Sequence, residues 1–387
     1  MGLPEPVAGQ QRGDSGNRRD DSLSQWIRWR MSGPDGVGAS RREFLAGKGH
    51  ADQSALRAEP DGGTEVPQAG DTLRIQTRAM NCQFAVFLDV DRRDQLDAVS
   101  SVLESVHGLE ALMTVYRSES PMARANASAA HSQVVLDEVL FDVVAMACRI
   151  ARETDGAFDP TTGPLVELWR QAREVGQVPE DDEVRRVRGL GGLEDVEIDV
   201  RAGSVFYRRA GVELNLGGIG KGFALDRIAD ELFTAEVGAY LLHGGHSSLL
   251  ARGPHQQHAG WPVGIRNPLF PSKRLATLVL RDQAMSTSGS GIESFRIGGR
   301  RFSDILDPRT GWPVEGMLSV TVLAETAAEA DALSTAFFVR GVEFARTCCD
   351  NRHGVSALLI PTPRRGQTLE PIVCGISDEV LFFEESV

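Results

Sequence analysis

The sequence predicts an α+β fold, and three observations support this prediction. Apolar runs with strand character and runs with helical spacing are mixed along the chain without a repeated strand-helix-strand unit. Hydrophobic residues make up 41% and charged residues 25% of the chain, as is typical of a globular protein. The length of 387 residues accommodates one large or two moderate domains.

Residues 1–70 differ from the rest of the chain. They are rich in Gly, Arg, Asp, Ser and Gln and have few periodic apolar positions, so we expect a mobile N-terminal extension. The folded domain should then span residues 71–387. Within the extension, Ser40–Leu45 resembles a twin-arginine export string, but residues 46–53 are polar where a working signal has an apolar segment. The sequence therefore leaves the compartment open and favours the cytoplasm, with export as the alternative.

Apolar periodicity predicts the elements of the folded part in order. Helical spacing predicts helices over Leu96–Met113, over Val135–Ile150, in a run that ends at Leu232, and over Ala327–Phe338. Short apolar runs predict strands over Phe84–Leu88, Val196–Val200, Ala239–Leu242, Ala276–Leu280, Ser319–Leu323 and Ala357–Ile360. Gly156 lies just past the second helix, where a left-handed residue is commonly needed.

Charge, hydropathy and cysteine usage narrow the function classes. Forty-one Lys and Arg against 54 Asp and Glu give a net charge of −13, which disfavours binding to long nucleic acids. No stretch approaches the length of about 18 apolar residues that a membrane span needs. The five cysteines form no Cys-x-x-Cys pair, so neither a disulfide framework nor a zinc site is expected. No Gly-x-Ser-x-Gly elbow points to a hydrolytic triad.

Two segments rich in turn residues could hold a ligand. In Thr154–Leu165, Asp159 either shapes a tight turn or accepts a hydrogen bond from a base or ribose, and the segment alone favours the turn. Asn215–Gly222 precedes a helical run and contains Lys221. Close backbone approach, a helix N-terminus and an ammonium group together predict a pyrophosphate cradle. It is not a Walker loop, because Phe223 follows the last glycine.

Two further segments carry oxygen-bearing side chains. In Ser303–Gly311, which is first of all a turn sequence, Asp304 and Asp307 could face one pocket. Asp331 and Thr335 stand four residues apart on an expected helix, so their oxygens lie on one face. A carboxylate with a hydroxyl suits Mg²⁺, whereas the alternative is that Thr335 bonds back to a helix carbonyl.

Six sequence blocks, taken in order from about residue 80 to residue 341, resemble those of the ApbE family, the FAD:protein FMN transferases. Each block is modest alone, and the ordered set is specific. The blocks are Tyr116 with Ser120 and Asn126; Gly156–Thr161; Gly218–Gly222 with Asp226; Thr287–Gly289; Asp307–Gly311; and Ala330–Asp331 with Thr335.

The resemblance implies a T-fold-related α+β architecture, with mixed or antiparallel sheets and packed helices, that binds FAD and Mg²⁺. A Ser or Thr hydroxyl of an acceptor protein would attack the FMN phosphorus of FAD and release AMP. The metal would be held by the Gly218 carbonyl, Asp331 and Thr335. The residues that would contact FAD are Met80, Tyr116, Ala157, Phe158, Asp159, Asn215, Lys221 and Ile305.

Three positions depart from the family pattern. Asp304 stands where members usually carry the histidine that deprotonates the acceptor, so Asp304 becomes the candidate catalytic base. An aspartate is a weak base at neutral pH unless burial raises its pKa. His246 replaces a usual Asp, and Asn81–Cys82 replaces Gly-Thr. For nearby His243, loop polarity is favoured over ligand contact. The sequence therefore predicts an FMN transferase, with an FAD-binding protein without transfer activity or an FAD pyrophosphatase as alternatives.

Overall fold

The computed structural model describes residues 72–245, 247–289, 294–364, 366 and 368–384. The predicted extension over residues 1–70, the Ser40–Leu45 string and His246 lie outside the described residues.

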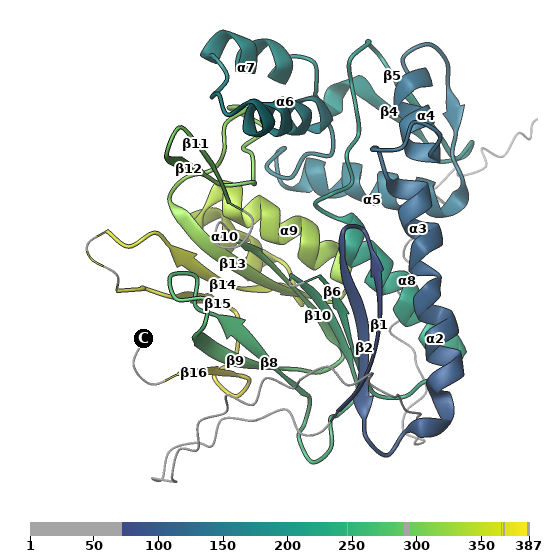
Figure 1. Cartoon of the computed structure of the whole chain (residues 1–387), viewed down its shortest axis with the longest axis vertical. Coiled ribbons are helices and arrows are strands. Elements are labelled where there is room, and N and C mark those ends of the chain that lie inside the picture. The colour runs from purple at the N-terminus through teal and green to yellow at the C-terminus, as the bar shows by residue number, and fades with distance from the viewer. Residues whose placement is uncertain (1–71, 246, 290–293, 365, 367, 385–387) are drawn as a thin grey trace, which may run out of the picture. The chain divides into compact units, whose positions relative to one another are not determined.

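An eight-stranded, fully antiparallel sheet forms the centre of the described part (Figure 1). Its buried strands are rich in Val, Leu, Ile and Ala, which pack well on a pleated surface. In spatial order the strands are β1 (Thr72–Ala79), β2 (Cys82–Asp89), β6 (Tyr240–Gly244), β7 (Ser248–Arg252), β10 (Gln283–Gly289), β13 (Met317–Ala324), β14 (Ser356–Pro361) and β15 (Ile372–Cys374).

The two faces of this sheet are covered differently. Helices α8 (Gly220–Thr234) and α9 (Ala327–Arg340) pack against one face and against each other, and their apolar residues join the main core. Residues of the other face, such as Leu249 and Met285, form a second core with a three-stranded sheet. The strands of that sheet, in spatial order, are β16 (Leu381–Phe383), β9 (Arg274–Leu280) and β8 (Trp261–Arg266).

The remaining elements flank these layers (Figure 1). The helices are α2 (Leu96–Glu104), α3 (Val106–Met113), α4 (Pro121–Ser128), α5 (Glu138–Glu153), α6 (Gly163–Val175), α7 (Asp181–Arg188) and α10 (Val342–Asn351), with short 3-10 turns at Arg93–Gln95 and Leu193–Asp195. The strands form a sheet of β3 (Val134–Val135), β5 (Ser204–Tyr207) and β4 (Val196–Asp199) and a hairpin of β11 (Phe295–Ile297) and β12 (Arg300–Phe302).

The predicted α+β class is confirmed, and the predicted strands match β2, β4, β6, β9, β13 and β14. Two helix predictions were wrong in detail. The helix expected from Leu96 to Met113 is divided into α2 and α3 at Ser105, whose hydroxyl bonds back to the Val102 carbonyl. The helix expected from Val135 begins instead at α5, because the Asp137 carboxylate caps the Val139 amide and the preceding residues pair in β3.

No helix in the described part of the chain is long and apolar enough to cross a membrane.

Candidate active site

A cavity of about 730 Å³ brings all four candidate segments together. Its walls come from the α8 and α9 N-terminal regions, from the ends of β10 and β13, from β8, and from the loops that carry Asp159 and Asp304. Such a volume lies in the range of small-molecule sites, which are about 300–1,000 Å³. The candidate residues that line it are Tyr116, Ala157, Phe158, Asp159, Asn215, Gly218, Lys221, Asp304, Ile305, Asp331 and Thr335.

One side of the cavity, which we call the helix wall, consists of Gly217, Gly218, Lys221, Asp331 and Thr335. Helices α8 and α9 hold this wall in place, because each helix caps the N-terminus of the other. The carboxylate of Asp226 on α8 accepts the Ala327 and Ala328 amides of α9, each at 2.9 Å. The Asp331 carboxylate on α9 accepts the Gly222 amide of α8 at 3.1 Å. Each helix therefore caps the first turn of the other.

Close approach of the helices explains the glycine at position 222. A Cβ placed there would lie 2.1 Å from the Ala327 carbonyl oxygen, far inside van der Waals contact. Only glycine lets the first turn of α8 cross α9 at this distance. This crossing brings Lys221 close to Asp331, with Nζ 3.8 Å from Oδ2.

Asp331 is a buried carboxylate surrounded by donors. It is only 5% exposed. Its Oδ1 accepts hydrogen bonds from the Ser286 hydroxyl at 3.0 Å and the Ser248 hydroxyl at 3.3 Å. Burial among these groups fixes its position at the base of the cavity, while Lys221 supplies the nearest full positive charge.

The donor set beside Asp331 is made of oxygens. Thr335 Oγ1 lies 3.4 Å from the Asp331 carbonyl, which agrees with the back-bonding alternative, and 3.4 Å from Ser288 Oγ. Gly218 is adjacent, since a Cβ on it would lie 3.7 Å from Thr335 Oγ1. Among the described residues, no cluster of three or more His, Cys, Asp or Glu side chains is placed to hold a metal ion. One carboxylate and one hydroxyl are nevertheless oxygen ligands of the kind that Mg²⁺ takes, since this ion commonly uses one or two carboxylates and completes its shell with phosphate oxygens.

The Asp159 segment forms a shaped turn at the cavity. Asp159 Oδ1 accepts the Thr161 amide at 2.8 Å and the Thr161 hydroxyl at 2.7 Å, as the Asx-turn interpretation expected. Burial raises the pKa of Asp159, while the two hydrogen bonds from Thr161 lower it in part. Phe158 is buried and packs beside Gly218, 3.2 Å from the position that a Cβ would take. Tyr116, which is 73% exposed, offers a free aromatic face at the cavity.

Asp304 and Asp307 occupy different environments, so the expectation that both face one pocket was wrong. Asp304 lines the cavity and is exposed. Asp307 instead forms a bidentate pair with Arg309 at 2.7 and 2.9 Å, which holds the turn.

Met80 is the candidate residue that does not line the cavity. It lies with Asn81 in the two-residue turn between β1 and β2, where both have positive φ, of 50° and 56°. Such φ values are typical of tight hairpin turns, and Met80 packs partly against the main core. Its contact with FAD stays a prediction.

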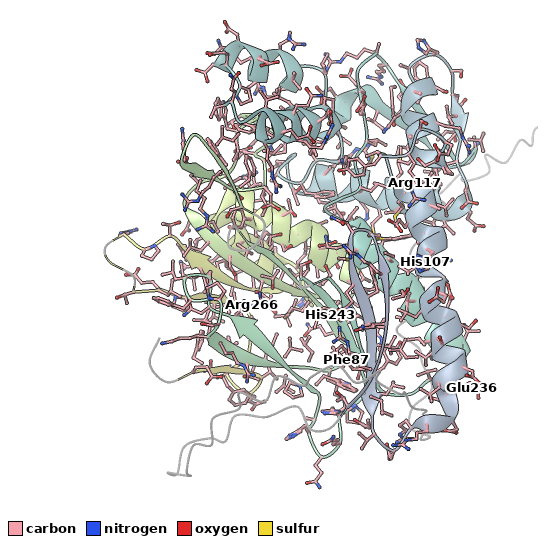
Figure 2. All side chains as sticks on the ribbon, in the orientation of Figure 1. Phe87, His107, Arg117, Glu236, His243 and Arg266 are labelled. Atoms are coloured by element: carbon pink, nitrogen blue, oxygen red, sulfur yellow. The ribbon has the colours of Figure 1, made fainter. Side chains whose placement is uncertain are left out.

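Several lining residues were not named as site residues from the sequence. Ser288 and Gly289 belong to the block Thr287–Gly289, which carried a usable signal. His243 also lines the cavity, in an edge contact with Phe87 whose ring centroid lies 6.4 Å away (Figure 2). The β8 residues gave no sequence signal, because an edge strand of this kind has no motif.

The family model for the ApbE family matches residues 76–359. The FAD:protein FMN transferase of Salmonella typhimurium is 30% identical over 297 residues, which cover 75% of this chain and 81% of that protein. The corresponding protein of Klebsiella pneumoniae is 31% identical, with 68% and 82% covered.

Solved structures agree with the match. The ApbE protein of Thermotoga maritima has a TM-score of 0.68 and 29% identity, and the match covers 75% of this chain and 94% of that one. The flavinyl transferase ApbE of Pseudomonas stutzeri in its apo form has a TM-score of 0.68 and 27% identity, with 82% and 98% covered.

The fold, the cavity and these relatives define an α+β enzyme of the transferase class. More particularly, the chain belongs to the ApbE family.

Proposed function

We propose that this chain is a Mg²⁺-dependent FAD:protein FMN transferase, which joins FMN from FAD to a Ser or Thr of an acceptor protein and releases AMP. The single observation that carries the proposal is the meeting of Lys221, Asp331 and Thr335 in one cavity with the glycine turn before α8. An ammonium group, a helix N-terminus and an oxygen donor set together suit the diphosphate of a dinucleotide.

Different residues of the cavity would bind different parts of FAD. Lys221 and the α8 N-terminus face the negative diphosphate. Tyr116 supplies an exposed ring on which a flavin or adenine can stack. The other proposed contacts with FAD are Met80, Ala157, Phe158, Asp159, Asn215 and Ile305. The Gly218 carbonyl, Asp331 and Thr335 would hold Mg²⁺, which when bound would neutralise charge that develops on the phosphates.

The proposed reaction is a phosphoryl-type transfer. The acceptor's hydroxyl oxygen forms a bond to the phosphorus on the FMN side of FAD, and the bond from that phosphorus to the bridging oxygen breaks. AMP leaves with the bridging oxygen. Asp304, at the cavity surface, would take the hydroxyl proton. Catalysis would come mainly from positioning and charge neutralisation.

A second candidate is an FAD-binding protein without transfer activity. The replacement of the family's usual histidine by Asp304 favours it, because the ordinary pKa of an aspartate makes it a weak base near neutral pH. A third candidate is an FAD pyrophosphatase, in which water replaces the acceptor and FMN and AMP are both released.

The experiment uses purified protein, FAD, MgCl₂ and a mixture of short peptides that each carry one Ser or Thr. Transfer predicts AMP together with peptides heavier by one FMN minus water, and both products disappear with EDTA. Free FMN with AMP and no labelled peptide would identify the pyrophosphatase. Bound FAD without AMP under any metal condition would identify the binding protein.

A further inference from the structure

A second part of the cavity lining comes from the outer strand of the small sheet. Strand β8 pairs with β9 on one side only, among the described residues (Figure 1). We give the name β8 wall to the cavity-lining stretch of β8 and the two residues that follow it, which consists of Val263, Gly264, Ile265, Arg266, Asn267 and Pro268. An unpaired strand edge is a template for another extended segment.

The hydrogen-bond pattern identifies which backbone groups of β8 point outward. The Val279 amide donates to the Val380 carbonyl at 2.8 Å, so Val279 faces β16 and its neighbour Leu278 faces β8. Leu278 pairs with Val263, whose backbone groups therefore face β9. Strand alternation then turns the N–H and C=O of Gly264 away from β9, toward the open edge.

The sequence of β8 is adapted to such an edge. Pro262, two residues before Gly264, has the same outward orientation, and proline is tolerated in sheets where no ladder partner needs its missing N–H. Gly264 is exposed and lacks a side chain that would obstruct an incoming backbone. Leu249, Met285 and Leu318, which share a core with Val263 and Ile265 of β8, add apolar surface to the same cavity.

The two walls therefore differ in the ligand that they suit. The helix wall carries the ammonium group and oxygen donors for phosphate, whereas the β8 wall offers outward backbone groups together with the apolar Val263 and Ile265 and the polar Arg266 and Asn267. A transferase needs both substrates in one cavity, and a Ser or Thr hydroxyl reaches a recessed phosphorus only if the backbone that carries it enters too. Building on the function proposed above, we propose that the acceptor's target segment enters as an extended strand and pairs with the β8 edge at Gly264.

The experiment identifies one labelled peptide from the Ser and Thr mixture and then methylates its backbone amides one at a time. Strand pairing predicts losses of labelling rate of about 10-fold at alternate amides and little change at those between, because only every second N–H faces the edge. A flat pattern, or one without a period of two, would overturn the inference and leave FMN transfer standing. If no peptide is labelled, FMN transfer itself fails, and the inference fails with it.

Two variants at Gly264 test whether the outward backbone N–H of β8 binds the acceptor. Gly264→Pro removes the outward N–H without removing a ladder donor, and we expect kcat/KM for the peptide to fall about 10-fold. Gly264→Ala keeps the N–H, and the three heavy atoms nearest to its Cβ would belong to the flexible Arg274 side chain, with Nε at 2.9 Å. We expect this variant to keep more of the labelling rate than Gly264→Pro, because only the proline variant loses the outward N–H, with FAD affinity within about twofold in both variants. Loss of FAD affinity in Gly264→Pro, with a flat methylation pattern, would assign the β8 wall to the dinucleotide instead.

Discussion

The α8–α9 junction and the loop that carries Asp304 lie at the same cavity but are built in opposite ways. At the junction, the carboxylates of Asp226 and Asp331 are each 5% exposed and accept first-turn amides across the helix pair. Asp304 is exposed, and the turn beside it is held by Asp307 and Arg309. The comparison teaches that the two helix carboxylates beside the proposed diphosphate site are buried and fixed by backbone amides, whereas Asp304, the proposed base, lies on an exposed loop.

The largest effect is expected from a substitution at the closest contact between α8 and α9. Gly222→Ala places a Cβ 2.1 Å from the Ala327 carbonyl oxygen, so α8 and α9 must move apart. We expect the free energy of unfolding to fall by about 3 kcal/mol, as measured by chemical denaturation. Gly108→Ala in α3 is the control, because a Cβ there meets nothing within 4 Å and should stabilise by about 0.5–1 kcal/mol. Equal stability of the two variants would contradict the close crossing.

The second-largest effect is expected from a substitution that removes one of the two reciprocal helix caps. Asp226→Ala leaves the Ala327 and Ala328 amides without their acceptor, and we expect a loss of about 2 kcal/mol in unfolding free energy. Asp226→Asn keeps one acceptor oxygen and should lose about half as much. If both variants unfold like the wild type, Asp226 does not cap α9.

The substitution Asp304→His tests whether the exposed residue of this comparison acts as a base. A histidine at this position is half-protonated near neutral pH and is a better base than an exposed aspartate. We expect the rate of FMN transfer to rise at least about 10-fold, with unfolding free energy changed by less than about 0.5 kcal/mol. Asp304→Asn serves as the control without a base. A rate in Asp304→His no higher than in Asp304→Asn would remove position 304 from proton transfer.

The smallest expected effect concerns Asp159, a cavity carboxylate that is less buried than Asp226 and Asp331 and accepts two hydrogen bonds from Thr161. Because burial raises its pKa in the folded state, ionisation destabilises the fold as pH rises from about 3.8 through the folded pKa. Asp159→Asn can keep the hydrogen bonds from Thr161 without that charge. We expect the variant to gain up to about 1 kcal/mol relative to wild type at pH 7 and less at pH 4, by denaturation at both pH values. A difference that does not depend on pH would show that ionisation of Asp159 is not the cause.

Short sequence spacings explain which parts of this site could be predicted from the sequence. The Asx turn at Asp159 and the shared helix face of Asp331 and Thr335 depend on spacings of two and four residues, so the sequence contains them directly. The donors to Asp331 from Ser248 and Ser286 lie 83 and 45 residues away and become neighbours only when β7 pairs with β10. Sheet order brings them together, and no spacing within the sequence predicts it.

The same reasoning accounts for the larger misses. The β8 wall reaches the cavity because the small sheet packs on the central sheet through Leu249 and Met285, a contact that periodicity cannot predict. Met80 lies in a tight turn at the edge of the main core, away from the cavity lining, and its contact with FAD stays a prediction. The exposure of Asp304 likewise depends on how its loop lies over the cavity.

The most direct test of the central claim is a fluorescence titration of FAD into wild type, Lys221→Met and Asp331→Asn, each with MgCl₂ and with EDTA. We predict that wild-type affinity falls at least about 10-fold in EDTA and that Lys221→Met binds at least about 10-fold more weakly under both conditions. Asp331→Asn should lose the response to magnesium. If all three proteins bind FAD with the same affinity, with and without metal, the central claim is contradicted. That claim is that this cavity binds the diphosphate of FAD through Lys221 and a cation coordinated by oxygen atoms.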